Sequence, residues 1–267
     1  MNSAFWSLKN GAGPIIAVAN HHGHLLRPEV ANMMSLDEAS QLREEDPFTG
    51  DWADLVPTCL VAQHSRFEVD LNRPRESAVY LTPEDAWGLS VWRSVLPRDQ
   101  VERSLAAYDS FYSHVRHLLE DLVLTHGRVV VFDLHSYNHR RQGPDGPLAD
   151  PEENPEVNIG TGKMDRQRLA PIVDRCINEL RAFDYHGRHL DVRENVKFRG
   201  GNFPRWIHET FPDTVCSIAI EFKKFFMDEW TGQPDHDHLY TIGQTLQRAA
   251  DAVTEELESI GQIEAQQ

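Results

Sequence analysis

Short apolar, β-branched runs alternate with amphipathic helical patterns along this sequence, and this alternation constrains the fold more than any other feature. Each run is bounded by Gly, Pro or polar residues, which is typical of strands buried on both faces. The predicted strands are residues 14–19, 58–62, 128–134, 190–192 and 214–222. Because strands that alternate with helices form sheets covered on both sides, we predict an α/β fold.

Three segments place apolar residues at the three- and four-residue spacing of one helix face. They are residues 101–122, residues 169–180 with Asp165 as a candidate N-cap, and residues 239–260. The acidic, histidine-rich residues 235–238 directly precede the last helix. Acidic capping of that helix explains them without a metal.

The length of 267 residues favours a single domain that spans residues 1–267, because domains of ~100–200 residues are typical. Residues 142–161 are rich in Pro, Gly and acidic residues, and we predict an insertion or lid loop there. The net charge of −16 argues against nucleic-acid or anionic-membrane partners, and no apolar run approaches a membrane span. Cys59, Cys176 and Cys216 are widely spaced, which favours the cytoplasm over a disulfide-linked secreted protein.

Polar residues that directly follow predicted strands are the first candidates for a site, because ligands bind at the carboxyl ends of strands in α/β sheets. His21 and His135 both occupy such positions. Imidazole and carboxylate are the usual ligands of a catalytic zinc, so these two histidines form a candidate half-site. The acidic residues 44–46 can supply the carboxylate, and Asp133 is placed to orient His135.

Two further groups of residues have candidate catalytic and binding functions. Glu221 ends a predicted buried strand, where it needs either an ion-pair partner, such as Lys223 or Arg199, or a function in proton transfer. Arg66, Asn72 and Arg73 place several hydrogen-bond donors in one short stretch. Such donors suit a carboxylate, although a surface ion-pair cluster is the alternative.

Several motifs occur in the order typical of one family. They are His21-His22-Gly23, Glu45-Asp46-Pro47-Phe48-Thr49, Ser65-Arg66-Phe67-Glu68-Val69-Asp70-Leu71-Asn72-Arg73-Pro74, Asp133-Leu134-His135-Ser136, Asn195-Val196-Lys197-Phe198-Arg199-Gly200-Gly201, Ile220-Glu221 and Met227-Asp228-Glu229. Together they resemble the N-formylglutamate amidohydrolase family, a relative of the zinc carboxypeptidases and aspartoacylases. The resemblance implies a phosphorylase/hydrolase-like three-layer α/β/α sandwich with a mixed, mostly parallel sheet.

The resemblance also implies the activity and its residues. It implies a zinc-dependent hydrolase of acidic N-acyl amino acids, most of all N-formyl-L-glutamate, as in histidine degradation. Zinc would be bound by His21, Glu45 and His135, with Glu44, Asp46 and His24 as alternatives to Glu45 and His22 as an alternative to His21. Glu221 and Arg66 would be catalytic, and Asn72, Arg73, Asn195 and Arg199 would bind substrate. The other hypotheses are a carboxypeptidase-like or other N-acyl-amino-acid hydrolase, and a non-catalytic carboxylate- or metal-binding protein.

Overall fold

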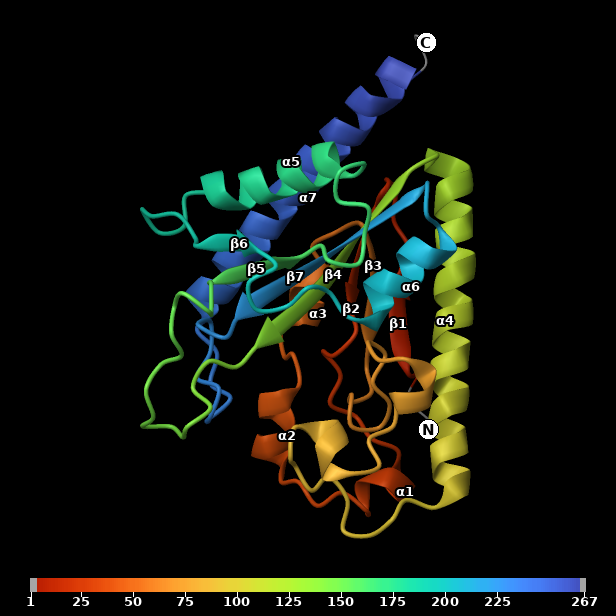
Figure 1. The fold of residues 1–267 in the computed structure, drawn as a ribbon, viewed down its shortest axis with the longest axis vertical. Coiled ribbons are helices and arrows are strands. Elements are labelled where there is room, and N and C mark those ends of the chain that lie inside the picture. Colours follow the sequence, from red (N-terminus) through yellow and green to blue (C-terminus); the bar gives the residue numbers. More distant parts are fainter. Residues whose placement is uncertain (1–3, 265–267) are drawn as a thin grey trace.

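A seven-stranded sheet forms the centre of the computed structural model, which describes residues 4–264 (Figure 1). Its strands are β1 (Trp6–Lys9), β2 (Ile15–Ala19), β3 (Thr58–Ala62), β4 (Val129–Tyr137), β5 (Val157–Gly160), β6 (Val192–Glu194) and β7 (Val215–Lys223). Their order across the sheet is β1-β3-β2-β4-β7-β5-β6. Strands β3, β2, β4 and β7 run parallel, whereas β1 and β5 are antiparallel to their neighbours β3 and β7. The sheet is therefore mixed and mostly parallel.

Helices cover both faces of this sheet and complete the three-layer α/β/α fold. The described helices are α1 (Pro28–Ala31), α2 (Glu38–Glu44), α3 (Thr49–Ala53), α4 (Arg98–His126), α5 (Ala170–Ala182), α6 (Asn202–Thr210) and α7 (His236–Glu264), with short 3-10 helices η1 (Arg75–Ser77) and η2 (Pro83–Ala86). Apolar residues of α3, α5 and α7 pack on one face, and those of α4 and α6 pack on the other. Figure 1 shows α4 along one side of the sheet and α5 with α7 on the opposite side.

The two faces of the central strands differ near their carboxyl ends. In β4, Val130, Phe132 and Leu134 all pack in the core beneath α5 and α7. On the opposite face, Val131 belongs to the second core, but the next residues with the same orientation are Asp133 and His135. This change from apolar to polar side chains opens a site on the α4 and α6 face, at the carboxyl end of the sheet.

The predicted strands and helices are present, with shifts at their ends. The strand predicted at residues 190–192 lies at Val192–Glu194, and α5 begins at Ala170, after a turn in which Asp165 accepts a hydrogen bond from the backbone of Arg168. Two strands were not predicted. β1 is a short, exposed edge strand, and β5 lies within residues 142–161, where the sequence predicts an insertion or lid loop.

Strand β5 escapes prediction because its sequence contains a polar residue in a fully buried position. Asn158 is 0% exposed, yet its amide donates to the Phe198 carbonyl and its oxygen accepts from the Lys197 backbone. These partners, about forty residues away in sequence, compensate the cost of burying the amide.

Three further observations on the described residues concern the cysteines, the hydropathy of the helices and the cap of α7. Cys59, Cys176 and Cys216 are all buried and unpaired. Between residues 4 and 264, no helix combines the length and the apolar character needed to cross a membrane. At the start of α7, Asp235 accepts hydrogen bonds from two backbone N–H groups, which confirms its predicted capping function.

Candidate active site

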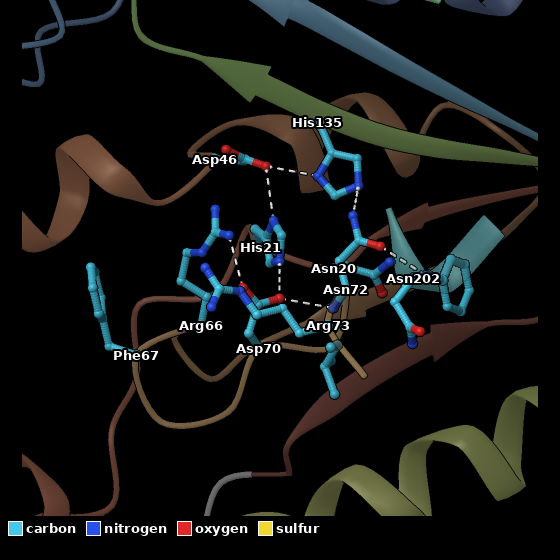
Figure 2. A network of polar contacts seen from close by, with 12 residues as sticks. Asn20, His21, Asp46, Arg66, Phe67, Asp70, Asn72, Arg73, His135 and Asn202 are labelled. Carbon is cyan, nitrogen blue, oxygen red and sulfur yellow. Dashed lines mark hydrogen bonds and ion pairs between the residues drawn. The ribbon is translucent and has the colours of Figure 1, made fainter. Parts of the chain in front are cut away.

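Three buried side chains converge at the carboxyl end of the sheet. His21 lies two residues after the end of β2, Asp46 follows α2, and His135 lies in β4. Each offers one ligand atom, and these atoms all lie within 4.8 Å of one another. Asp46 Oδ2 is 3.3 Å from His21 Nδ1 and 2.9 Å from His135 Nδ1, so its carboxylate lies between the two rings (Figure 2).

Each histidine is oriented by a second carboxylate on the far side of its ring. His21 Nε2 lies 2.7 Å from Asp70 Oδ1, and His135 Nε2 lies 3.0 Å from Asp133 Oδ1. A ring that donates its Nε2 proton to a carboxylate has Nδ1 available for a metal. Asp133 thus occupies the orienting position expected from the sequence, and Asp70 is an equivalent residue that was not predicted.

The donor chemistry of this group suits a divalent cation. Two imidazole nitrogens and one carboxylate oxygen are the ligands of many zinc sites with an open coordination position. His21 Nδ1 is buried and forms no well-aligned hydrogen bond with any residue from 4 to 264, although Asp46 Oδ2 lies 3.3 Å away. A buried polar atom without a partner is unfavourable, and a metal ligand bond would satisfy it. The residues present therefore fit a metal ion.

Charge at the site also favours a cation. Burial lowers the pKa of His135, but the negative charges of Asp133 and Glu221 outweigh burial and hold that pKa well above its usual value. Burial raises the pKa of Asp46, but its contacts with His135 and His21 outweigh burial and hold that pKa well below its usual range. The site thus stabilises positive charge between ionised carboxylates.

Glu221 lies beside His135, because the two residues are paired in the register of β7 and β4. Burial raises the pKa of Glu221 to about 7, and the opposing effect of His135 does not cancel it. Among the described residues Glu221 forms no ion pair with Lys223 or Arg199, the alternative considered from the sequence. A carboxyl group that titrates near neutral pH and faces a cleft is suited to proton transfer.

Arg66 is held beside the same group of residues. Its guanidinium donates to Asp70 Oδ2 at 2.8 Å, to the Tyr80 hydroxyl at 3.1 Å and to the Glu44 carbonyl at 3.3 Å. Burial lowers the pKa of Arg66, but Tyr80 and Asp70 outweigh burial and raise it. Arg66 therefore remains a fixed positive charge at the cleft.

Glu45, the expected carboxylate ligand, lies outside the group of His21, Asp46 and His135. Its side chain contacts His24 Nδ1 at 2.5 Å, Gln41 Nε2 at 2.9 Å and the Ser65 hydroxyl. Glu45 has an extended backbone, which turns its side chain to the side opposite that of Asp46. The structure thus places Glu45 outside the histidine group and its alternative, Asp46, within it.

The two histidines next to His21 in the sequence have other partners. His24 contacts Glu45, as described above. His22 Nδ1 accepts a hydrogen bond from the Gly50 backbone at 3.1 Å, so its ring faces α3. Of the three histidines after β2, His21 is the one that meets His135.

A cleft with a volume of about 240 Å³ lies over these residues. His21, Asp46, Arg66, Asn72, His135, Arg199 and Glu221 line it, together with residues that were not predicted: Arg141, Asn138, Trp87 and Lys224 among others. Asn72 and Arg199, two of the four residues expected to bind substrate, thus line the cleft. The Arg199 guanidinium forms no hydrogen bond or ion pair with any described residue, which leaves it available for a ligand.

Two of the expected substrate-binding residues do not line the cleft. Arg73 packs over the rings of Tyr80 and Trp87, at 4.5 and 5.7 Å, with its Nε 3.7 Å from Asp70. Asn195 has a left-handed backbone, with φ of 57°, and its amide bonds the backbone and hydroxyl of Thr161. Asn195 therefore supports the loop that carries Arg199.

Residues 13–227 match the model of the N-formylglutamate amidohydrolase family. The chain belongs to this family. The match includes His21, Asp46, His135 and Glu221. No curated protein matches the chain in sequence.

Two solved structures share the fold over nearly the whole chain. N-formylglutamate amidohydrolase from Ralstonia eutropha JMP134 is 16% identical, with a TM-score of 0.73 and coverage of 97% of this chain and 99% of that one. The gene product Atu2144 from Agrobacterium tumefaciens is 19% identical, with a TM-score of 0.67 and coverage of 97% of both chains. The family and this fold support a hydrolase of the N-formylglutamate amidohydrolase kind.

Proposed function

We propose that this family member is a zinc-dependent amidohydrolase that cleaves the amide of an acidic N-acyl amino acid, with N-formyl-L-glutamate as the leading substrate. One observation carries the proposal. The Nδ1 atoms of His21 and His135 meet the Asp46 carboxylate in a cleft that also contains the buried Glu221. The three cysteines are buried and form no disulfide bond in the described chain, which favours a reducing compartment, so we propose a cytoplasmic location.

His21, Asp46 and His135 would hold the metal, so Asp46 replaces Glu45 in the proposed ligand set. When bound, zinc supplies Lewis acidity, which polarises an amide carbonyl and lowers the pKa of a water molecule. Asp70 and Asp133 keep both imidazole rings in the orientation that this binding requires.

Glu221 would move the proton in the reaction. With its pKa near 7, its carboxylate can take a proton from the attacking water and its acid form can give that proton to the leaving nitrogen. Arg66 would stabilise negative charge that develops on the carbonyl oxygen, because Asp70 and Tyr80 fix its guanidinium at the cleft.

Arg199 would bind the substrate carboxylate. It lines the cleft without a protein partner, and its planar guanidinium matches two carboxylate oxygens. The Asn72 side-chain amide also lines the cleft. Arg141 lines the cleft as well, with its Nη1 3.1 Å from Glu44 Oε2. Arg73, first expected in this role, instead stacks on Tyr80 outside the lining residues.

The test is a hydrolysis assay with N-formylglutamate, N-acetylaspartate and N-formylleucine on the zinc-loaded and chelator-treated protein. We expect hydrolysis of an acidic substrate that chelator removes and added zinc restores. Preference for N-formylleucine would refute acidic specificity. Full activity after complete metal removal would refute the metal dependence.

A further inference from the structure

Buried cations bind three consecutive carbonyl groups at the end of α2. Lys224 Nζ donates to the carbonyls of Arg43 and Glu45, both at 2.6 Å, and Arg66 donates to the Glu44 carbonyl between them. Carbonyls at a helix C-terminus lack partners within the helix and carry its negative dipole end. A buried ammonium is therefore a strong anchor for the chain that leaves α2.

The peptide unit between Glu45 and Asp46 is fixed at both of its polar groups. Its carbonyl accepts from Lys224, and its N–H donates to the His21 carbonyl at 2.9 Å. The peptide is planar, so two hydrogen bonds on opposite sides define its orientation. The Asp46 side chain leaves the backbone directly after this unit, and its direction follows from it.

Lys224 is suited to this task by its own environment. It is 1% exposed, and it follows Glu221 by three residues at the end of β7. Its backbone N–H donates to the Tyr137 carbonyl at 2.9 Å, which ties Lys224 to the end of β4. The ammonium thus links the Asp46 segment to the strands that carry His135 and Glu221.

We propose that Lys224 is a positioning residue that directs the Asp46 carboxylate toward the Nδ1 atoms of His21 and His135. The inference rests on the proposed function, since it requires Asp46 to bind the metal. Two of the three ammonium protons bind the Arg43 and Glu45 carbonyls, in the segment that leads to Asp46. Lys224 therefore acts on the metal through the position of Asp46. Because Lys224 also lines the cleft, the experiment must separate this effect from direct substrate contact.

The test measures zinc affinity of the metal-free protein by competition with a chromophoric chelator. Lys224→Met keeps the length of the side chain and removes its donors, and we expect the zinc Kd to rise ~10–100-fold, as for loss of other groups that orient metal ligands. At saturating zinc, kcat should recover and the KM for N-formylglutamate should equal that of the wild type. Lys223→Met is the matched control, because Lys223 donates to the Asn154 carbonyl instead, and its zinc Kd should not change.

A wild-type zinc Kd in folded Lys224→Met would overturn the inference, and so would a raised KM at unchanged zinc Kd. Lys224→Gln, whose shorter side chain cannot bind both carbonyls, serves if the Met variant does not fold, and it should also bind zinc more weakly. Wild-type protein and Asp46→Asn are measured alongside. If the wild type binds no zinc, or if Asp46→Asn binds it equally well, the proposed ligand set itself fails.

Discussion

Asp70 is the buried carboxylate whose removal tests how the site is supported. It is 0% exposed and accepts hydrogen bonds from His21 Nε2, Arg66, the Tyr80 hydroxyl and the Asn72 backbone. Asp70→Asn keeps the size of the side chain and removes its charge. We expect two separate losses, one in metal affinity and one in the free energy of unfolding.

The loss in metal affinity follows from the contact with His21. Loss of a partner that orients a metal ligand typically costs ~10–100-fold in affinity, which is ~1.4–2.7 kcal/mol. The loss in stability follows from Arg66, whose buried guanidinium would lack its carboxylate partner. Breaking a buried ion pair costs ~3–5 kcal/mol, and the lower end applies here because Asn keeps one acceptor oxygen.

Chelator competition measures the first loss, and urea unfolding of the metal-free protein measures the second. Asp109→Asn is the control, because Asp109 also pairs with an arginine, Arg75, but both side chains are 52% exposed. Its zinc Kd should stay at the wild-type value and its stability should fall by less than ~1 kcal/mol. The reasoning is refuted if Asp70→Asn binds zinc as the wild type does, or if the two variants lose equal stability.

Three further predictions address the other groups. Glu221→Gln should lower kcat by ~10²–10⁴-fold without changing the zinc Kd, because Gln cannot transfer a proton; an unchanged kcat would exclude Glu221 from the chemistry. Arg199→Lys should raise the KM for N-formylglutamate with little change in kcat, since the guanidinium fork is lost; an equal KM would instead assign carboxylate binding to Arg141, which also lines the cleft. Burial lowers the pKa of His208 from 6.5 to about 4. As the pH falls below 6.5, the unfolded chain therefore takes up a proton that the folded chain does not bind. The free energy of unfolding should rise by up to ~3 kcal/mol as the pH increases from about 4 to 6.5. In His208→Asn, urea titrations at several pH values should show this increment missing, and an unchanged pH dependence would contradict the assignment.

The sequence predicts those site residues that lie at the ends of buried strands. His21, His135 and Glu221 directly follow or end apolar runs, and the parallel arrangement of β2, β4 and β7 brings their carboxyl ends together. No comparable pattern covers Asp46, because it lies between two helices. Which acidic residue faces the histidines depends on the extended backbone of Glu45.

Residues that act through long-range contacts were not predictable from local patterns. Asp70 lies 49 residues from His21 in sequence, and Lys224 lies 179 residues from Glu45. In the sequence, Asp70 lies in a short stretch of charged residues of both signs, and such a stretch is also typical of an ion-pair cluster on the surface. Only the folded chain brings these charges against specific partners at the cleft.

The most direct test of the central claim is anomalous diffraction from crystals of the zinc-loaded protein. We predict a zinc peak with His21 Nδ1, His135 Nδ1 and an Asp46 carboxylate oxygen at ~2.0–2.2 Å, next to Glu221. A zinc ion bound by Glu45 and His24, or the absence of any zinc peak between His21 and His135, would contradict the account.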